Sequence, residues 1–344
     1  MPRHLNRPVQ VVRTGVVVLA MFAVAGCSSD PVDAPPPTIA PAQAAVSPPA
    51  TTTPAGTVRP LDAAVQSALF DTATGALVAL SPSDGASVVT LLPAAGPPRP
   101  VLLPATATAM TGDGAGQVYL AGRGGYFRLS VADGAVTRVD VEGQQATDFT
   151  AIARRADGKL VLGSADGAVY TLNSERTVGA QLKLFARVDA LVTQGNTTVV
   201  LDRGQTSVTA LDASGAGAEQ ALRAGDGATT MAADAAGRVL VADTRGNGLL
   251  VFGTDPLILR QRYPVHDAPY GLAGSSELAW VSQTASNTVI GYDLATGIPV
   301  EKVRYRTVQQ PNSLAFDESS GTLYVVSGSG AGVQVIPNAA VQPR

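Results

Sequence analysis

The chain has few of the residues on which much enzyme and cofactor chemistry depends. Its 344 residues include one cysteine, one tryptophan and two histidines. The single cysteine, Cys27, excludes an internal disulfide framework. Because His4 lies in the first few residues, before a cleavage site argued below, only His266 would remain, which excludes a zinc site of the usual His/Cys kind.

Charge is also scarce, at 15% of residues, and the formal net charge is −3. A mildly acidic chain has no basic footprint for a nucleic-acid backbone, so we expect no nucleic-acid partner. Glycine and proline are abundant instead, with 36 and 24 residues, and 45% of the chain is hydrophobic. This composition is typical of a turn-rich β protein rather than a helical bundle, and the length suffices for one large core or two modest ones.

Residues 1–26 have the pattern of a cleaved signal peptide. A segment with three arginines precedes an apolar run over residues 15–25, which is shorter than the ~20 residues that a membrane-spanning helix needs. The run ends in Val24-Ala25-Gly26-Cys27, which resembles the lipobox of bacterial lipoproteins. The resemblance implies that Cys27 is lipidated and becomes the first residue of the mature chain. An ordinary signal peptide followed by a chance cysteine is the alternative.

A lipidated Cys27 would place the protein at the cell membrane, lipid-anchored on its extracytoplasmic face. Two or three acyl chains, each contributing ~0.8 kcal/mol per buried CH₂ group, would make this anchoring stable. Residues 28–60 are rich in Pro, Ala, Thr and Ser, and have too few large apolar groups to offset the entropy of ordering. We therefore expect residues 27–60 to be a disordered, semi-extended linker and residues 61–344 to be the folded domain.

The folded domain is predicted from an internal repeat. Residues 267–338 hold two copies of one pattern, each with three short apolar runs separated by Gly, Asn, Asp and Ser. A period of ~40 residues with this pattern predicts the blades of a β-propeller. The run that we take as the second strand of each blade recurs at Val65–Asp71, Gln117–Ala121, Lys159–Ser164, Thr197–Asp202, Arg238–Asp243, Glu277–Ser282 and Thr322–Ser327.

These recurrences predict an all-β propeller of about seven four-stranded blades. The last repeat stops after its third strand, near Ile336. A strand near Thr57–Asp62 could complete that blade and close the ring, or it could instead begin the first blade. We favour closure, because no disulfide is available to hold the two ends of the chain together. We also expect a monomer.

Two segments carry a family resemblance. Arg238–Phe252 resembles an NHL repeat, and Trp280–Asp293 with Thr296-Gly297 is similar to the YVTN repeat of surface-layer and lactonase-like propellers. Together with the lipobox, the chain resembles actinobacterial, mycobacterial-type propeller lipoproteins. These motifs specify strands and turns more than chemistry, so the resemblance implies a fold and little about activity.

Candidate functional residues lie in two sets of loops. The loops that enter the innermost strands should converge on the central channel, and carry Asp148, Asp189, Asp226, Tyr270 and Asn312. Lactonase-type relatives bind a divalent cation from such positions, so Asp148, Asp189, Asp226 and Asn312 are the candidate ligands for Ca²⁺ or another divalent cation. The alternative is that each Asp side chain hydrogen-bonds to the backbone of its own turn and has no role in metal binding.

The loops between the second and third strands are expected on one rim. They carry Arg123, Asp166, Arg203, Asp243, Arg245 and Asn287. With Tyr270 and Asn312, these residues form the predicted surface for a ligand or a partner protein, and a merely solvated rim is the alternative. His266 stands beside Asp267 at a junction between blades with no nucleophile elbow nearby, so we predict no catalytic residue.

The sequence thus favours a binding or scaffold module of the cell envelope that needs no cofactor. Its partner would be an unknown envelope protein or small ligand. The alternatives are a metal-dependent hydrolase of the lactonase (gluconolactonase-like) type and a sensor of an envelope ligand.

Overall fold

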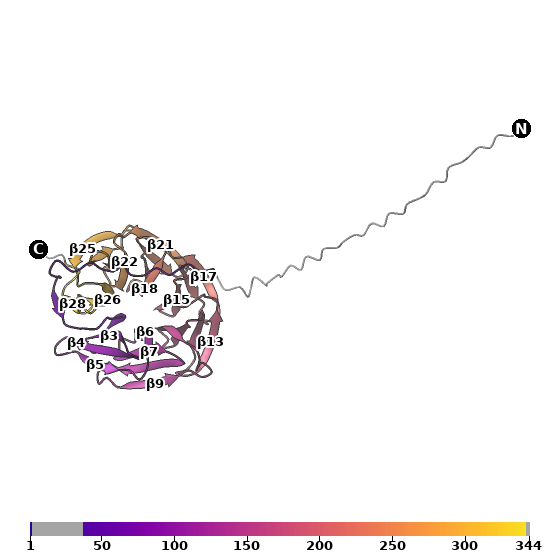
Figure 1. Cartoon of the computed structure of the whole chain (residues 1–344), viewed down its shortest axis with the longest axis horizontal. Helices are drawn as coiled ribbons and strands as arrows, with labels where there is room; N and C mark the ends of the chain where they lie inside the picture. Colours follow the sequence, from indigo (N-terminus) through magenta and orange to yellow (C-terminus); the bar gives the residue numbers. More distant parts are fainter. Residues whose placement is uncertain (2–36, 342–344) are drawn as a thin grey trace. The chain divides into compact units, whose positions relative to one another are not determined.

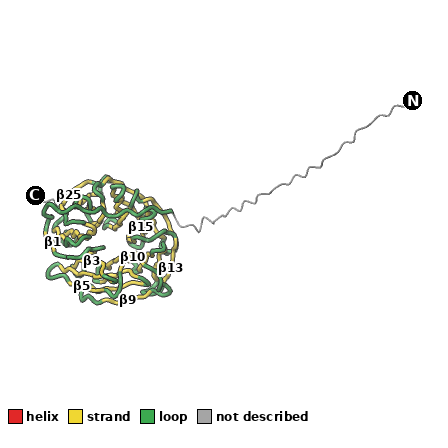
Figure 2. The backbone as a smooth tube through the Cα atoms, in the orientation of Figure 1, coloured by secondary structure: helices red, strands yellow, loops and turns green. Residues whose placement is uncertain are grey.

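The computed structural model describes residues 37–341 together with Met1. The predicted signal peptide after Met1, Cys27 and the linker up to residue 36 lie outside the described residues. Every regular element in the described part of the chain is a β-strand (Figure 2). Among these residues, no helix is long and apolar enough to cross a membrane.

The described strands form seven four-stranded antiparallel sheets. Blade 1 is made of β2 (Ser67–Asp71), β3 (Ala76–Ser83), β4 (Ala86–Pro93) and β5 (Arg99–Leu102), and blade 2 of β6 (Ala107–Gly112), β7 (Gln117–Gly122), β8 (Gly125–Ser130) and β9 (Val136–Asp140). Blade 3 is made of β10 (Phe149–Arg154), β11 (Leu160–Ser164), β12 (Ala168–Leu172) and β13 (Val178–Lys183). Blade 4 is made of β14 (Ala190–Gln194), β15 (Thr197–Asp202), β16 (Ser207–Leu211) and β17 (Ala218–Arg223).

The remaining three blades follow the same plan. Blade 5 is made of β18 (Ala228–Ala233), β19 (Arg238–Asp243), β20 (Gly248–Thr254) and β21 (Leu257–Pro264), and blade 6 of β22 (Pro269–Gly274), β23 (Ala279–Gln283), β24 (Thr288–Asp293) and β25 (Val300–Arg306). Blade 7 is made of β26 (Pro311–Asp317), β27 (Thr322–Ser327), β28 (Val333–Ile336) and β1 (Thr57–Arg59).

The seven sheets stand around a central axis with one strand of each facing inward (Figure 1). The innermost strands are β2, β6, β10, β14, β18, β22 and β26, and each contacts the next around the ring, including β26 with β2. The all-β, seven-bladed propeller predicted from the repeat is therefore confirmed. Closing the ring leaves no open sheet face on either side of any blade.

The ring is closed by a strand from the beginning of the folded domain. β1 pairs antiparallel with β28, with Val58 opposite Gln334 in register. The side-chain amide of Gln334 is buried and donates to the carbonyl oxygens of Ala55 (2.8 Å) and Arg306 (2.9 Å). Closure by a strand near Thr57–Asp62 is thus confirmed, over a shorter segment.

One strand assignment in the first blade was wrong. Val65–Asp71 was predicted as a second strand, but β2 within it is the innermost strand of blade 1. The second strand is β3, which pairs with β2 through a short turn from Asp71 to Ala76. The apolar run of β3 was overlooked because it follows β2 after only a short turn. The other six second strands lie where they were predicted.

The hydrophobic core lies between neighbouring blades rather than at one centre. One cluster joins β3 and β4 of blade 1 to β7 and β8 of blade 2, through side chains such as Leu80 and Phe127. At the junction of blades 6 and 7, Trp280 is fully buried and stacks on Phe316, with ring centroids 5.8 Å apart. Each blade therefore depends on both neighbours to bury its faces, as the repeat pattern requires.

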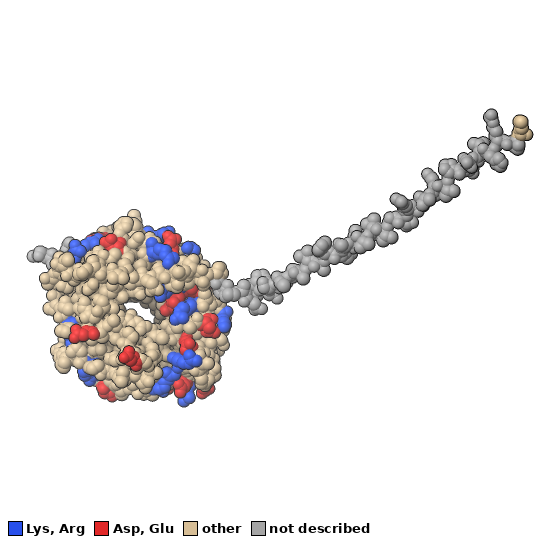
Figure 3. All heavy atoms as spheres, viewed as in Figure 1, with Lys and Arg blue, Asp and Glu red and all other residues tan. Residues whose placement is uncertain are grey.

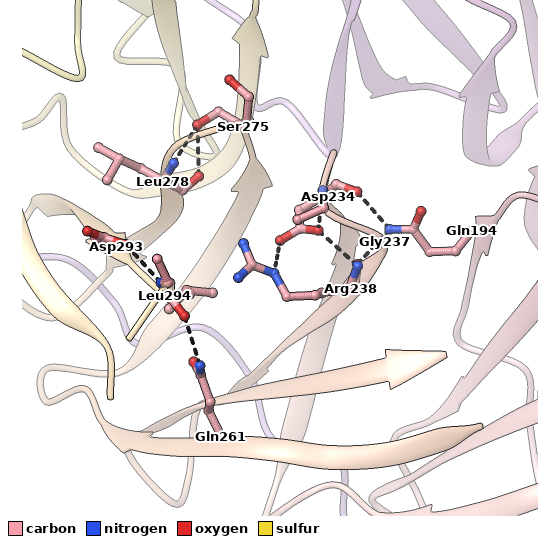
Figure 4. A network of polar contacts seen from close by, with 12 residues as sticks. Gln194, Asp234, Gly237, Arg238, Gln261, Ser275, Leu278, Asp293 and Leu294 are labelled. Carbon is pink, nitrogen blue, oxygen red and sulfur yellow. Dashed lines mark hydrogen bonds and ion pairs between the residues drawn. The ribbon is translucent and has the colours of Figure 1, made fainter. Parts of the chain in front are cut away.

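Polar links tie neighbouring blades together at the end of the propeller where the first and second strands of each blade turn. The amide of Gln194 on β14 donates to the carbonyl oxygens of Asp234 and Arg238 in blade 5, at 2.8 and 2.7 Å (Figure 4). The buried Asp234 carboxylate accepts from Arg238 Nε at 2.6 Å. Gln261 of β21 likewise donates to the Leu294 carbonyl oxygen in blade 6 at 3.0 Å. Both glutamine amides donate to main-chain carbonyl oxygens of the next blade, so these contacts tie neighbouring blades together.

Candidate functional site

The two sets of loops singled out in the sequence lie together on one face of the ring. Arg123, between β7 and β8, pairs with Asp148, which precedes β10, at 2.9 Å. The Arg203 N–H, between β15 and β16, donates to Asp189 before β14 at 2.8 Å. We call this the strap face, for the segment that lies on it.

Residues 37–56, which we call the strap, cross this face in extended form without regular secondary structure. They form one compact unit with the propeller. The strap, drawn in indigo in Figure 1, enters beside β17. It then passes the loops of blades 4, 5 and 6 before it reaches β1 in blade 7. This part of the predicted linker is therefore bound to the domain, not free, because the face supplies partners for its main chain.

At its first half the strap is held by two of the predicted rim arginines. The Ile39 N–H donates to the Gly204 carbonyl oxygen at 2.8 Å. Arg245 donates to the carbonyl oxygen of Ala40 at 2.7 Å, and Arg203 donates to that of Ala42. Both guanidinium groups thus contact main-chain oxygens rather than acidic side chains.

Near the junction of blades 6 and 7 the strap makes its densest set of bonds. The Ala45 N–H donates to Thr284 Oγ1 at 3.1 Å, and Ser47 Oγ donates to the Thr284 carbonyl oxygen at 2.6 Å. Gln310 donates from Nε2 to the Ala45 carbonyl oxygen at 2.9 Å. Asn287, 6% exposed, donates to the Pro48 carbonyl oxygen at 2.7 Å. Of the four bonds just described, only that of the Ser47 hydroxyl involves a side chain of the strap.

Two small side chains of the strap enter the face. Ala42 is 7% exposed and Ser47 is 4% exposed, whereas most of the residues between them are exposed or half-buried. Glycines leave space beneath the strap: a Cβ at Gly227 would stand 2.9 Å from the Ala42 Cβ, and one at Gly204 would stand 3.2 Å from Thr38 Cγ2. A bulky side chain at either face position would lift the strap.

A cleft of about 630 Å³ opens beside the start of the strap. Its walls include the exposed apolar side chains Ile39 and Leu184 and the half-buried Leu222 of β17. Thr38 and the exposed Arg223 also line it. The cleft has the volume of a small-ligand site and a mixed apolar and polar lining.

Asp243, one of the rim residues predicted to bind a ligand or partner, is fully buried and instead holds the loops around it by hydrogen bonds. Its carboxylate accepts hydrogen bonds from the N–H groups of Asp226, Gly227 and Gly246, at 2.8 to 3.1 Å. Asp202 has the same place in blade 4, where it accepts from Ala186, Arg187 and Gln205. These carboxylates hold the loops that carry Arg245 and Arg203 and have no exposed surface to offer a ligand.

The other predicted rim residues lie on the same face at different distances from the strap. Asn312 accepts from Gln310 Nε2 at 2.9 Å, so it supports a strap-binding side chain. Tyr270 on β22 is half-buried, and its carbonyl oxygen accepts from Thr230. Arg123 and Asp166 lie in blades 2 and 3, and Asp166 pairs with Lys183 at 2.9 Å. Among the described residues, neither side chain has a hydrogen bond or ion pair with the strap.

The predicted metal ligands are engaged in separate contacts. Asp148 pairs with Arg123, Asp226 lies 3.9 Å from Arg223, and Asp189 pairs with Arg187 at 3.2 Å. Burial raises the pKa of the Asp189 carboxyl, against the bond from Arg203 and the neighbouring positive charges, which lower it. Within residues 37–341, no three His, Cys, Asp or Glu side chains are grouped so that they could hold a metal ion.

His266 lies in an exposed loop before β22, and its carbonyl oxygen accepts a hydrogen bond from Gln283 Nε2 at 2.8 Å. The face residues that the sequence reasoning missed are Thr284, Gln309 and Gln310, together with the strap positions Ala42 and Ser47. No signal marked the two strap positions, because a Pro/Ala-rich strap and a Pro/Ala-rich free linker have the same composition. Without the strap, nothing distinguished Thr284, Gln309 and Gln310 from other polar loop residues.

Comparison with known proteins identifies the fold. No family model matches the chain, and no curated protein matches it. The structure is similar to that of a streptogramin B lyase, with a TM-score of 0.67 and 11% identity over 83% of this chain and 97% of that one. It is also similar to virginiamycin B lyase from Staphylococcus aureus, with a TM-score of 0.66 and 11% identity over 80% and 96% of the two chains.

A chain of the mitotic checkpoint complex is similar too, with a TM-score of 0.69 and 12% identity over 86% of this chain and 98% of that one. Two of these proteins are lyases and the third belongs to a checkpoint complex. At such identities the likeness shows the β-propeller and nothing about what this chain binds.

Proposed function

We propose that the protein is a non-catalytic binding module of the bacterial cell envelope, with the strap face as its working surface. The observation that carries this proposal is that polar side chains of this face hydrogen-bond the main chain of a segment outside the blades. Arg203, Arg245, Asn287 and Gln310 each serve a strap carbonyl oxygen. A face that holds one polypeptide in this way has the chemistry to hold another.

The membrane anchor is part of the same proposal and depends on the lipobox resemblance around Cys27. Replacing Cys27 with Ser removes the only thiol of the chain. We expect the wild-type protein to incorporate an alkyne-labelled fatty acid and to remain with the membrane fraction, and Cys27→Ser to lose the label. Equal labelling of both proteins would contradict the anchor and leave the binding face untouched.

The binding role is tested in intact cells by photo-crosslinking followed by mass spectrometry. A photoreactive residue at Arg123 probes the strap face outside the strap, and one at Ser174, in the exposed turn between β12 and β13, probes the opposite end of blade 3. We expect a reproducible protein crosslink from position 123 that position 174 does not give. Identical patterns from the two positions would contradict a dedicated face.

The rival function is a metal-dependent hydrolase of the lactonase type that uses Asp148, Asp189, Asp226 and Asn312. Elemental analysis of the purified protein decides between the two. A stoichiometric divalent cation that is lost in Asp226→Ala would favour the hydrolase, and loss of a lactone-hydrolysing activity in the same variant would establish it.

A further inference from the structure

The strap is recognised by features that almost any extended polypeptide could supply. Its bonds to Arg203, Arg245 and Asn287 all end on main-chain carbonyl oxygens. Pro41 and Pro48, which have no N–H group, are tolerated because the face does not need a donor there. The constraints on side chains are small size at Ala42 and Ser47, five positions apart, and a hydroxyl at Ser47, which donates to the Thr284 carbonyl oxygen and accepts from the Gln310 N–H.

The strap is also an incomplete occupant of the site it fills. Arg203 Nε is buried beneath it with no hydrogen-bond partner. Val46 is 90% exposed and Ile39 is 42% exposed, so the strap buries little apolar surface. The cleft beside Thr38 leaves Leu184 uncovered. The strap is covalently attached to the propeller, so its effective concentration at the face is on the order of millimolar. A segment of low intrinsic affinity can therefore occupy the face.

We propose that the strap face is a track for an extended polypeptide rich in Pro, Ala and Ser, and that residues 37–48 occupy it in the absence of that partner. The inference rests on the proposed binding function and names its partner class. A partner that places a larger apolar residue where Thr38 lies would also cover Leu184 and Leu222, and would bind more tightly than the strap.

The probe is a fluorescent 14-residue peptide with the sequence of residues 37–50. It is titrated against the full chain carrying Ala42→Arg and Ser47→Arg, which prevent the strap from seating and leave every face residue in place. We expect this variant to bind the peptide at least tenfold more tightly than the wild type, whose own strap competes. A peptide with Leu at the Thr38 position should bind three- to tenfold more tightly still.

Two matched controls define the site. The peptide with the same two arginine substitutions should not bind, and adding Asn287→Ala to the protein variant should weaken binding about tenfold. A variant that melts like the wild type and fails to bind the peptide overturns the proposal. Such a failure is distinct from failure of the proposed function, which the crosslink from position 123 tests without the strap.

A measurement on the wild type covers the case in which the variant does not fold. At millimolar peptide, amide hydrogen exchange at Ile39 and Ala45 should accelerate, because the peptide releases the strap from Gly204 and Thr284. Unchanged exchange at saturating peptide overturns the track. A wild-type dimer that dissociates on adding peptide would support it, and would identify the partner as the strap of a second copy.

Discussion

Ser47 and Gln310 bond each other in both directions. The Ser47 N–H donates to Gln310 Oε1 at 3.0 Å, and the Gln310 N–H donates to Ser47 Oγ at 3.1 Å. A serine in the strap and a glutamine at the start of blade 7 thus satisfy one another across 263 residues of sequence. This pair fixes where the strap lies on the face.

Removing the glutamine side chain should release the strap without unfolding the propeller. Gln310→Ala removes an acceptor for Ser47 and a donor to Ala45, each worth about 1 kcal/mol. We expect amide exchange in the strap to rise up to about thirtyfold, the equivalent of about 2 kcal/mol, and a protease to cut between residues 37 and 50. Ser174→Ala, in an exposed turn at the other end of the ring, is the control and should leave both unchanged.

Asp243 should matter for stability through the loops it braces. Its carboxylate serves three N–H groups in a fully buried place, so Asp243→Ala leaves buried donors unsatisfied and should cost about 3 kcal/mol or more. Chemical denaturation measures this loss. Asp133→Asn, in an exposed turn of blade 2, should change little, and a similar loss in both variants would refute the bracing role.

Gly56 should be sensitive because it leads into the strand that closes the ring. Its φ is +72°, and an added Cβ would stand 2.1 Å from the Val335 carbonyl oxygen. Gly56→Ala should therefore destabilise the protein by about 2–3 kcal/mol and lower Tm by roughly 5 °C. Gly75 has a similar φ, +63°, but an added Cβ there would have no atom within 4 Å. Gly75→Ala therefore measures the backbone strain without the steric clash. Equal shifts in the two variants would mean that β1 contributes little to closure.

Two aspartates of the strap face should respond to pH with opposite sign. A hydrogen bond from Ser164, and then Lys183, lower the pKa of Asp166, so its contribution is present above the unfolded pKa and is lost as pH falls through the folded one. Burial raises the pKa of Asp189, so its ionised form opposes folding at neutral pH, and this cost disappears as pH falls.

Replacing each aspartate by asparagine separates these contributions. At pH 7 we expect Asp189→Asn to raise Tm by about 2 °C and Asp166→Asn to lower it slightly. The Asp189 difference should shrink as pH falls toward 3, because the raised pKa lets its carboxyl take up a proton, whereas the Asp166 difference should persist until pH falls through its lowered pKa. Melting curves between pH 3 and pH 7 check the signs, and a lower Tm for Asp189→Asn at pH 7 would contradict the burial argument.

The sequence predicted the propeller well because each blade repeats a local pattern. Six of seven second strands and the shared face of Arg203 and Asp189 follow from alternation and turn residues, which act over short distances. The closing strand follows instead from the last repeat, which lacks a fourth strand of its own. The role of Asp243 was missed because an Asp after a strand looks the same whether its carboxylate faces solvent or three N–H groups.

The strap could not be predicted for a different reason. Ala42 and Ser47 are ordinary residues of a linker until the loops of blades 4 to 7 come together, with contacts 161 and 237 residues later in the chain. Only the closed ring creates the partners that order them. Gly204 and Gly227 make room for the strap, but in the sequence they are two among many turn glycines.

Strap binding would also set how far the propeller can stand from the lipid anchor proposed at Cys27. From Cys27 to Pro37 there are ten peptide links, which span at most about 35 Å, whereas release of the strap up to Thr57 extends the leash to about 100 Å. If Cys27 carries the lipid proposed above, a partner that takes the track also frees the disc to rise from the bilayer surface. Occupancy of one face would then be converted into height above the membrane.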